Sequence, residues 1–176
     1  MKWRAFTALP VVVLVTSSAW AEMPFCLGDI CIGKPLTTTM PLKPMEGKYC
    51  GQLRYEHKDG NISWIIYVNA AKLNRPIKPG AVYYIERRID YDKKLYDKGR
   101  LTALYSEKYG SPREIEAGSL INNLTYGVAG SSITKEVEIY SVGDELYAYE
   151  HIYDFNTKQD LEGMDRKCTA DNIIPD

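Results

Sequence analysis

Apolar and aromatic residues alternate with polar residues over most of this chain, and that period of two constrains the fold more than any other feature. Successive side chains of a strand point to opposite faces of a sheet, so the alternation predicts strands with one buried face. Turn residues separate the alternating segments, as in Lys58-Asp59-Gly60-Asn61, which is typical of β-hairpins. We expect strands at 53–57, 62–68, 81–89, 120–128, 135–142 and 145–155.

One segment, 92–109, departs from this period, because its apolar side chains recur at three- and four-residue spacing, as on one face of a helix. Either Asp90 or Asp92 can cap the start of this helix. Gly110 suits the left-handed position after the last turn, and Pro112 prevents continuation. The sequence therefore predicts an α+β domain, with an antiparallel β-sheet and one main helix (about 92–109) packed on one face.

Residues 1–21 have the three parts of a secretory signal peptide. Basic residues precede an apolar run at 5–15, and Ala19-Trp20-Ala21 places small residues at the minus-three and minus-one positions. Polar residues end the apolar run well short of the roughly 20 residues that span a bilayer. We expect cleavage after residue 21, which leaves 22–176 as a single α+β domain in the periplasm or outside the cell, with no stable membrane insertion.

The charge of the expected mature chain excludes two classes of partner. Of the 22 Lys and Arg residues, two precede the cleavage site, which leaves 20 basic residues against 23 acidic ones. A protein that binds nucleic acid or an anionic membrane carries an excess of basic residues. We therefore expect neither nucleic acid nor a membrane surface as a partner.

Four cysteines, Cys26, Cys31, Cys50 and Cys168, lie in the expected mature chain, and an even number in an exported protein favours disulfides. Gly28-Asp29 suits a two-residue hairpin turn, and this turn would place Cys26 opposite Cys31 within disulfide range. That pairing leaves Cys50 for Cys168. The spacing lacks the two paired cysteine knuckles of a zinc site, so we predict two disulfides and no metal.

Two segments, 27–36 (LGDICIGKPL) and 104–112 (LYSEKYGSP), resemble segments of a loose group of small exported proteobacterial proteins. Similar spacing occurs in the small outer-membrane-assembly lipoproteins and in β-lactamase-inhibitor-like modules, where a helix or helix pair packs on an antiparallel sheet. This chain lacks the lipid-attachment cysteine and has Lys34 where Met is common, which argues against anchoring in the outer membrane. The resemblance implies a non-catalytic, protein-binding role in a bacterial envelope.

The sequence holds two histidines, His57 and His151, and both lie in predicted strands. A hydrolase that used either one as a general base would need a nucleophile and an orienting group beside it. Ser131 and Ser132 follow a glycine-rich segment that lacks the spacing of a nucleophile elbow. The chain also has no P-loop, HExxH or dinucleotide-binding motif. We expect no enzymatic activity and no cofactor, and we keep a hydrolase using His57 or His151 as an alternative.

Tyrosine is unusually frequent, with 14 residues, and Tyr147, Tyr149, His151 and Tyr153 share one face of a predicted strand. If that face is buried, these rings form part of the core. If it is exposed, they form a rigid aromatic surface with hydroxyl groups, as in surfaces that bind proteins or glycans. We name these four residues as the candidate binding residues.

These features together predict an exported periplasmic protein that binds another protein of the cell envelope. An immunity protein, or an inhibitor of an envelope-directed toxin or hydrolase, fits this description. An envelope-assembly or structural factor is the main alternative. The sequence does not determine the oligomeric state.

Overall fold

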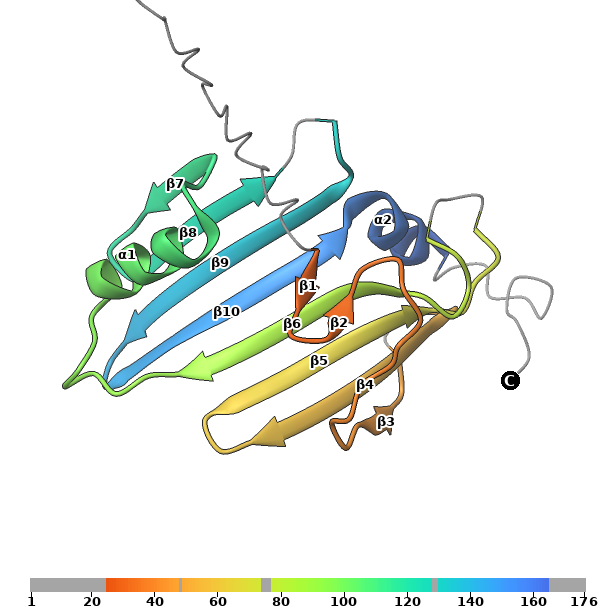
Figure 1. Ribbon diagram of the computed structural model, residues 1–176, viewed down its shortest axis with the longest axis horizontal. Coiled ribbons are helices and arrows are strands. Elements are labelled where there is room, and N and C mark those ends of the chain that lie inside the picture. Colours follow the sequence, from red (N-terminus) through yellow and green to blue (C-terminus); the bar gives the residue numbers. More distant parts are fainter. Residues whose placement is uncertain (1–24, 48, 74–76, 128–129, 165–176) are drawn as a thin grey trace, which may run out of the picture.

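The computed structural model describes residues 25–47, 49–73, 77–127 and 130–164. Its main feature is an eight-stranded antiparallel sheet of spatial order β3-β4-β5-β6-β10-β9-β8-β7 (Figure 1). Its strands are β3 (Lys43–Met45), β4 (Gln52–Asp59), β5 (Ile62–Asn69), β6 (Val82–Asp90), β7 (Glu114–Ala117), β8 (Ile121–Gly127), β9 (Ile133–Val142) and β10 (Glu145–Asp154). A separate hairpin consists of β1 (Cys26–Leu27) and β2 (Ile30–Cys31), and the helices are α1 (Lys98–Tyr109) and α2 (Phe155–Met164). The expected α+β class is confirmed.

Two meanders of four strands make up the sheet. The meanders β3–β6 and β7–β10 meet at their last strands, because β6 pairs antiparallel with β10. A helix follows each meander, α1 after β6 and α2 after β10. The central strands of the sheet are therefore the last strand of each half.

One face of the sheet carries the core. The β1–β2 hairpin packs on this face at the β5–β6 half, where Leu27 and Ile30 join a buried cluster with Ile66 and Ile85. Helix α1 packs over β8 and β9, and its Leu101 and Tyr105 lie in a second buried cluster. Figure 1 shows α1 and the hairpin on the same side of the sheet.

Helix α1 begins six residues later than expected. The capping residue is Asp97, whose side chain accepts a hydrogen bond from the backbone N–H of Arg100 at 2.7 Å. Residues 92–95 form a turn instead, since the backbone N–H of Leu95 donates to the carbonyl of Asp92. The prediction of a start at about 92, capped by Asp90 or Asp92, is therefore wrong, whereas the end before Gly110 (φ 84°) is confirmed.

Helix α2 was not expected from the sequence. The side chain of Asp154 accepts a hydrogen bond from the backbone N–H of Thr157 at 2.8 Å, which satisfies a donor of the first turn. Only Thr157 and Leu161 of this helix are buried, so the helix buries about one side chain per turn. In Figure 1 the helix lies at the end of the sheet that β10 reaches.

A buried polar cluster lies between α1 and the sheet. Glu150 of β10 is fully buried on the core face. Arg87 donates to its carboxylate through Nε at 2.5 Å, Lys108 through Nζ at 2.9 Å and Tyr109 through its hydroxyl at 3.0 Å. Lys135 of β9 is also buried, and its Nζ lies 3.9 Å from the centroid of the Tyr109 ring. The cluster therefore ties α1 to both β9 and β10.

The predicted bridge between Cys26 and Cys31 is confirmed, with the two Cα atoms 4.0 Å apart. The hairpin has the expected register, with Leu27 opposite Ile30, and Gly28 takes the positive φ of 62° that the turn requires. The other predicted bridge, Cys50–Cys168, involves Cys168, which lies outside the described residues, as does the predicted signal peptide. Within the described ranges no helix is long and apolar enough to span a membrane.

Candidate functional site

The four candidate binding residues lie on the face of the sheet opposite the core, which we call the open face. Along β10, the alternate residues Leu146, Ala148 and Ile152 are buried on the core side. Tyr147, Tyr149, His151 and Tyr153 point the other way and are partly exposed. Of the two alternatives that the alternation left, core or surface, the structure shows the second.

Aromatic rings run across the open face from β5 to β9 in one contiguous group. Neighbouring ring centroids in this group lie 5.0 to 6.0 Å apart. We call this group the tyrosine band, and its members are Tyr67, Tyr84, Tyr153, His151, Tyr149, Tyr147 and Tyr140. The sequence indicated the four β10 members, and strand register brings Tyr67, Tyr84 and Tyr140 beside them.

Carboxylates hold several hydroxyl groups of the tyrosine band in place. The Tyr84 hydroxyl donates to Glu86 at 3.1 Å, that of Tyr140 to Glu138 at 2.7 Å and that of Tyr153 to Glu136 at 3.0 Å. Burial and these neighbouring carboxylates raise the pKa of Tyr84, Tyr140 and Tyr153. The three hydroxyls therefore stay protonated and remain donors at neutral pH.

His151 lies at the centre of the tyrosine band, with only 13% of its side chain exposed. Its Nδ1 lies 2.8 Å from the Tyr84 hydroxyl and 3.7 Å from Oε2 of Glu86. On the other side of the ring, Nε2 lies 3.8 Å from Oε2 of Glu138. The neighbouring His151 imidazole and the hydrogen bond from the Tyr140 hydroxyl lower the pKa of Glu138, which therefore carries a negative charge at neutral pH.

His57 lies on the opposite face of the sheet from His151, because its cross-strand partner is the core residue Trp64. Its Nδ1 is 3.2 Å from the backbone carbonyl of Pro41. The two histidines therefore do not act at one site. Among the described side chains, neither imidazole is hydrogen-bonded to a serine, threonine or cysteine, the arrangement that the hydrolase alternative requires.

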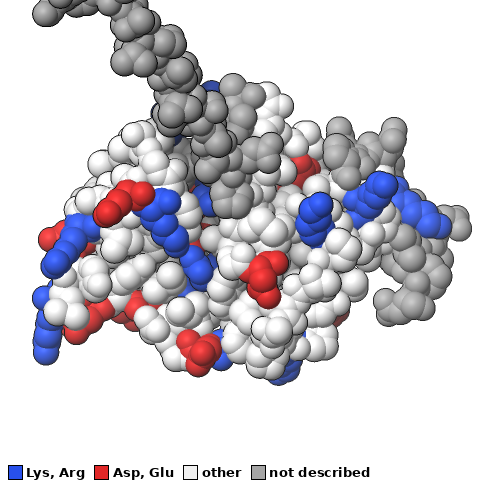
Figure 2. Space-filling model, in the orientation of Figure 1, with Lys and Arg blue, Asp and Glu red and all other residues white. Residues whose placement is uncertain are grey.

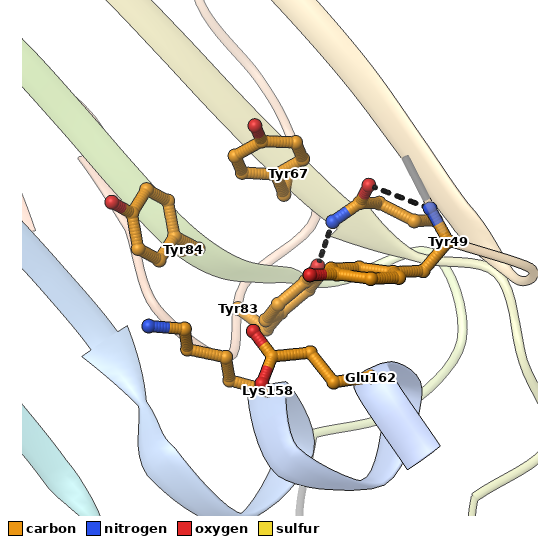
Figure 3. Close-up of a pocket in the computed structure, with 7 residues that line it drawn as sticks. Tyr49, Tyr67, Tyr83, Tyr84, Lys158 and Glu162 are labelled. Carbon is orange, nitrogen blue, oxygen red and sulfur yellow. Dashed lines mark hydrogen bonds between the residues drawn. The ribbon is translucent and has the colours of Figure 1, made fainter. Parts of the chain in front are cut away.

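A small pocket of about 160 Å³ lies at the end of the tyrosine band where α2 begins (Figure 3). Lys158 of α2 points from the helix toward the Tyr84 ring, and Glu162 points toward Tyr83. The remaining lining residues are Tyr49, Gln52 and Tyr67. The sequence did not indicate this pocket, because it depends on a helix that the sequence pattern did not predict.

The floor of this pocket is fixed by hydrogen bonds. The amide Nε2 of Gln52 donates to the Tyr83 hydroxyl at 2.5 Å, and the backbone N–H of Tyr49 donates to Oε1 of Gln52 at 3.3 Å. Lys158 also places its Nζ 4.9 Å from the centroid of the Tyr153 ring, a cation–π contact. The pocket and the tyrosine band thus form one continuous surface.

A wider and shallower hollow, of about 480 Å³, lies over β7, β8 and β9 at the other end of the tyrosine band. Tyr140 belongs to both the band and the hollow, and Glu116, Asn123 and Glu138 also line the hollow. The open face therefore offers a ridge of aromatic rings between two depressions. A surface of this shape suits recognition of another molecule through shape complementarity.

Comparison of the chain with protein-family models, with curated proteins and with solved structures found no match.

Proposed function

We propose that this is an exported protein-binding protein whose partner docks on the open face, across the tyrosine band. The contiguous group of aromatic rings on a sheet face is the observation that carries the proposal. Tyrosine supplies a large amphipathic contact area with only two side-chain torsions to fix, and it is enriched in binding surfaces. Because carboxylates already hold the hydroxyls of Tyr84, Tyr140 and Tyr153, these side chains lose little conformational entropy when a partner binds.

The partner that fits best is another protein of the cell envelope. The signal peptide predicted at 1–21 directs the chain out of the cytoplasm, and the Cys26–Cys31 bridge suits an oxidising compartment. We propose Cys50–Cys168 as a second bridge of the exported protein. An immunity protein, or an inhibitor of an envelope-directed toxin or hydrolase, acts through such a surface without chemistry of its own.

The proposal is tested by capture of a partner from an envelope extract, with the surface variant Tyr147→Ala/Tyr149→Ala as the decisive comparison. A stoichiometric partner retained by the wild-type protein should be lost by this variant. The matched control is Leu104→Ala, which truncates an exposed side chain of α1 on the covered side of the sheet. A partner that the double variant still retains at wild-type level would show that binding takes place elsewhere.

A further inference from the structure

We infer that the pocket beside α2 binds one neutral sugar ring, a hexopyranose unit with free hydroxyl groups. The residues of the pocket that carry the inference are Tyr67, Tyr83 and Tyr84 of the sheet and Lys158 and Glu162 of α2 (Figure 3). It goes beyond the proposed function, because a sugar in this pocket needs no protein on the tyrosine band. The local backbone, the size of the pocket and the chemistry of its lining support it.

A β-bulge in β6 builds the pocket. Two successive residues of β5, Tyr67 and Val68, lie opposite Tyr84 and Val82. Tyr83 is therefore an extra residue between two paired positions. In a regular strand Tyr83 and Tyr84 would point to opposite faces of the sheet, whereas here both side chains line the pocket. Bulges re-aim side chains in this way and are frequent beside functional sites.

The pocket has the size of one six-membered ring. Its volume is about 160 Å³, and a cavity of about 150 Å³ in a protein interior holds one benzene ring. The centroid of the Tyr67 ring lies 6.2 Å from that of Tyr83 and 5.2 Å from that of Tyr84. These neighbouring rings give an aromatic wall on which the C–H face of a pyranose can pack. A single sugar ring therefore fits, with its outer substituents in solvent.

A buried hydroxyl supplies one hydrogen-bond donor to the pocket. Tyr83 is 2% exposed, and its hydroxyl accepts a hydrogen bond from Nε2 of Gln52. The Gln52 amide cannot be reversed, since its Oε1 accepts from the backbone N–H of Tyr49. Burial raises the pKa of Tyr83, so the hydroxyl keeps its proton at neutral pH. Among the described residues no hydrogen bond uses this proton, and an oxygen atom of a ligand can accept it.

Lys158 and Glu162 place one charge of each sign beside the pocket. They lie four residues apart on α2, a spacing at which Lys and Glu commonly form an ion pair. In the part of the chain that the structure describes, neither of them forms one. Instead Lys158 points toward the Tyr84 ring and Glu162 toward Tyr83. A donor and an acceptor are therefore open to a ligand in the pocket.

These groups together favour a neutral hydroxylated ring over a charged or an apolar ligand. An anion is repelled by Glu162 and a cation by Lys158. An apolar ring would leave the Tyr83 hydroxyl and both charged groups without hydrogen-bond partners, at a cost in desolvation. A sugar hydroxyl both donates and accepts. Neighbouring hydroxyls of one ring can therefore accept from Lys158 and Tyr83 and donate to Glu162.

The charge of the whole molecule provides no strong attraction for an ionic ligand. The expected mature chain has 20 basic residues against 23 acidic ones. On the face that carries α1 and the β1–β2 hairpin, basic and acidic side chains are interspersed (Figure 2). Electrostatic steering of a charged ligand needs an excess of one sign around its site. A neutral ligand is consistent with this balance.

A titration with simple glycosides tests the inference. The probes are methyl β-D-glucopyranoside, methyl β-D-galactopyranoside and methyl α-D-mannopyranoside, added to ¹⁵N-labelled mature protein and followed by amide chemical shifts. At least one should bind with a dissociation constant on the order of millimolar, with the largest shifts at Tyr84, Lys158 and Glu162. Cyclohexylmethanol, a ring of the same size with a single hydroxyl, should bind at least about tenfold more weakly.

Two substitutions on α2 locate the site. Lys158→Met and Glu162→Gln should each weaken the bound glycoside about fivefold or more. The matched controls Lys94→Met and Glu107→Gln change the same residue types at exposed positions outside the pocket, and they should leave the affinity unchanged. A lack of saturable shifts with all three glycosides, equal binding of cyclohexylmethanol, or an unchanged affinity in either α2 variant would each overturn the inference.

A disaccharide of the bound unit identifies the source of the sugar. Binding at least as tight as that of the methyl glycoside supports the inference with a glycan chain as the source, and weaker binding supports it with a free monosaccharide. The outcome is separate from that of partner capture. If Tyr147→Ala/Tyr149→Ala loses the captured partner while no glycoside binds, the inference is wrong and the proposed function stands. If a glycoside binds as expected while the tyrosine variant keeps its partner, the inference stands and the proposed docking is wrong.

Discussion

The hydroxyl of Tyr84 lies 2.8 Å from Nδ1 of His151, and this contact joins β6 to β10 at the centre of the open face. The same hydroxyl reaches Glu86, and the other nitrogen of the imidazole faces Glu138. His151 thus stands between two carboxylates that lie on strands on either side of it. Removal of the imidazole takes away this cross-strand hydrogen bond of Tyr84 and opens a gap in the tyrosine band.

We therefore expect His151→Ala to weaken binding of the captured partner by roughly tenfold or more, as for a central residue of an interface. Its free energy of unfolding should change by less than about 1 kcal/mol, because the side chain lies on a sheet surface rather than in the core. The measurements are calorimetric titration with the partner and urea unfolding. His57→Ala, on the opposite face, is the matched control and should bind as tightly as the wild-type protein.

Glu150 should be essential for stability, although its charge is buried. In Glu150→Gln the neutral amide no longer compensates the partly buried Arg87, so we expect the free energy of unfolding to fall by about 3 kcal/mol or more. Urea unfolding at pH 7 measures the change. Glu145→Gln, at the exposed start of the same strand, should have almost no effect. A loss below about 1 kcal/mol in Glu150→Gln would show that water or another group compensates Arg87.

The alternation in the sequence was sufficient to predict the six long strands, because burial of one face imposes a period of two on a half-buried strand. It was not sufficient to assign the buried face of β10. Both sets of alternate residues in that strand are apolar or aromatic, apart from Glu150, His151 and the acidic ends. Which face is covered depends on where α1 and the hairpin pack, and contacts distant in the sequence decide that.

The missed elements share a physical cause. All residues of the edge strands β3 (Lys43–Met45) and β7 (Glu114–Ala117) are exposed, so packing places no constraint on their hydropathy. Helix α2 buries only two side chains, too few for a clear helical period. The cap formed by Asp154 and Thr157 was the available sequence signal for α2.

Export is checked most directly at the N-terminus of the mature protein. We expect the exported protein to begin at Glu22, because small residues at positions 19 and 21 direct cleavage after Ala21. Intact-mass measurement of protein recovered from the periplasm should match residues 22–176. Protein that retains residues 1–21 in the membrane fraction would contradict the predicted cleavage.

The second disulfide is testable by peptide mapping under non-reducing conditions. We expect one linked pair from Cys26 and Cys31 and another from Cys50 and Cys168. The longer bridge closes a loop of over 100 residues, so Cys168→Ser should lower the free energy of unfolding by about 2 to 5 kcal/mol. The recovery of a Cys31–Cys50 peptide from native protein would contradict both pairings.

Lys135 should make stability depend on pH in an unusual direction. Its side chain is 2% exposed and its Nζ has no hydrogen-bond partner in the described structure, and burial lowers its pKa to about 8. In the unfolded chain the pKa is about 10.4, so between pH 8 and 10 the unfolded state binds more protons. The free energy of unfolding should therefore rise with pH over that window.

Lys135→Met removes the cost of burying the ammonium group at neutral pH, which is about 2 to 3 kcal/mol for a shift of this size. We expect the variant to be more stable than the wild-type protein at pH 7, by up to that amount, and the two proteins to converge toward pH 10. Urea unfolding at pH 7, 8, 9 and 10 measures both curves. Parallel curves would show that Lys135 keeps its proton at ordinary cost in the folded protein, through a compensating interaction with Glu150 or with the Tyr109 ring.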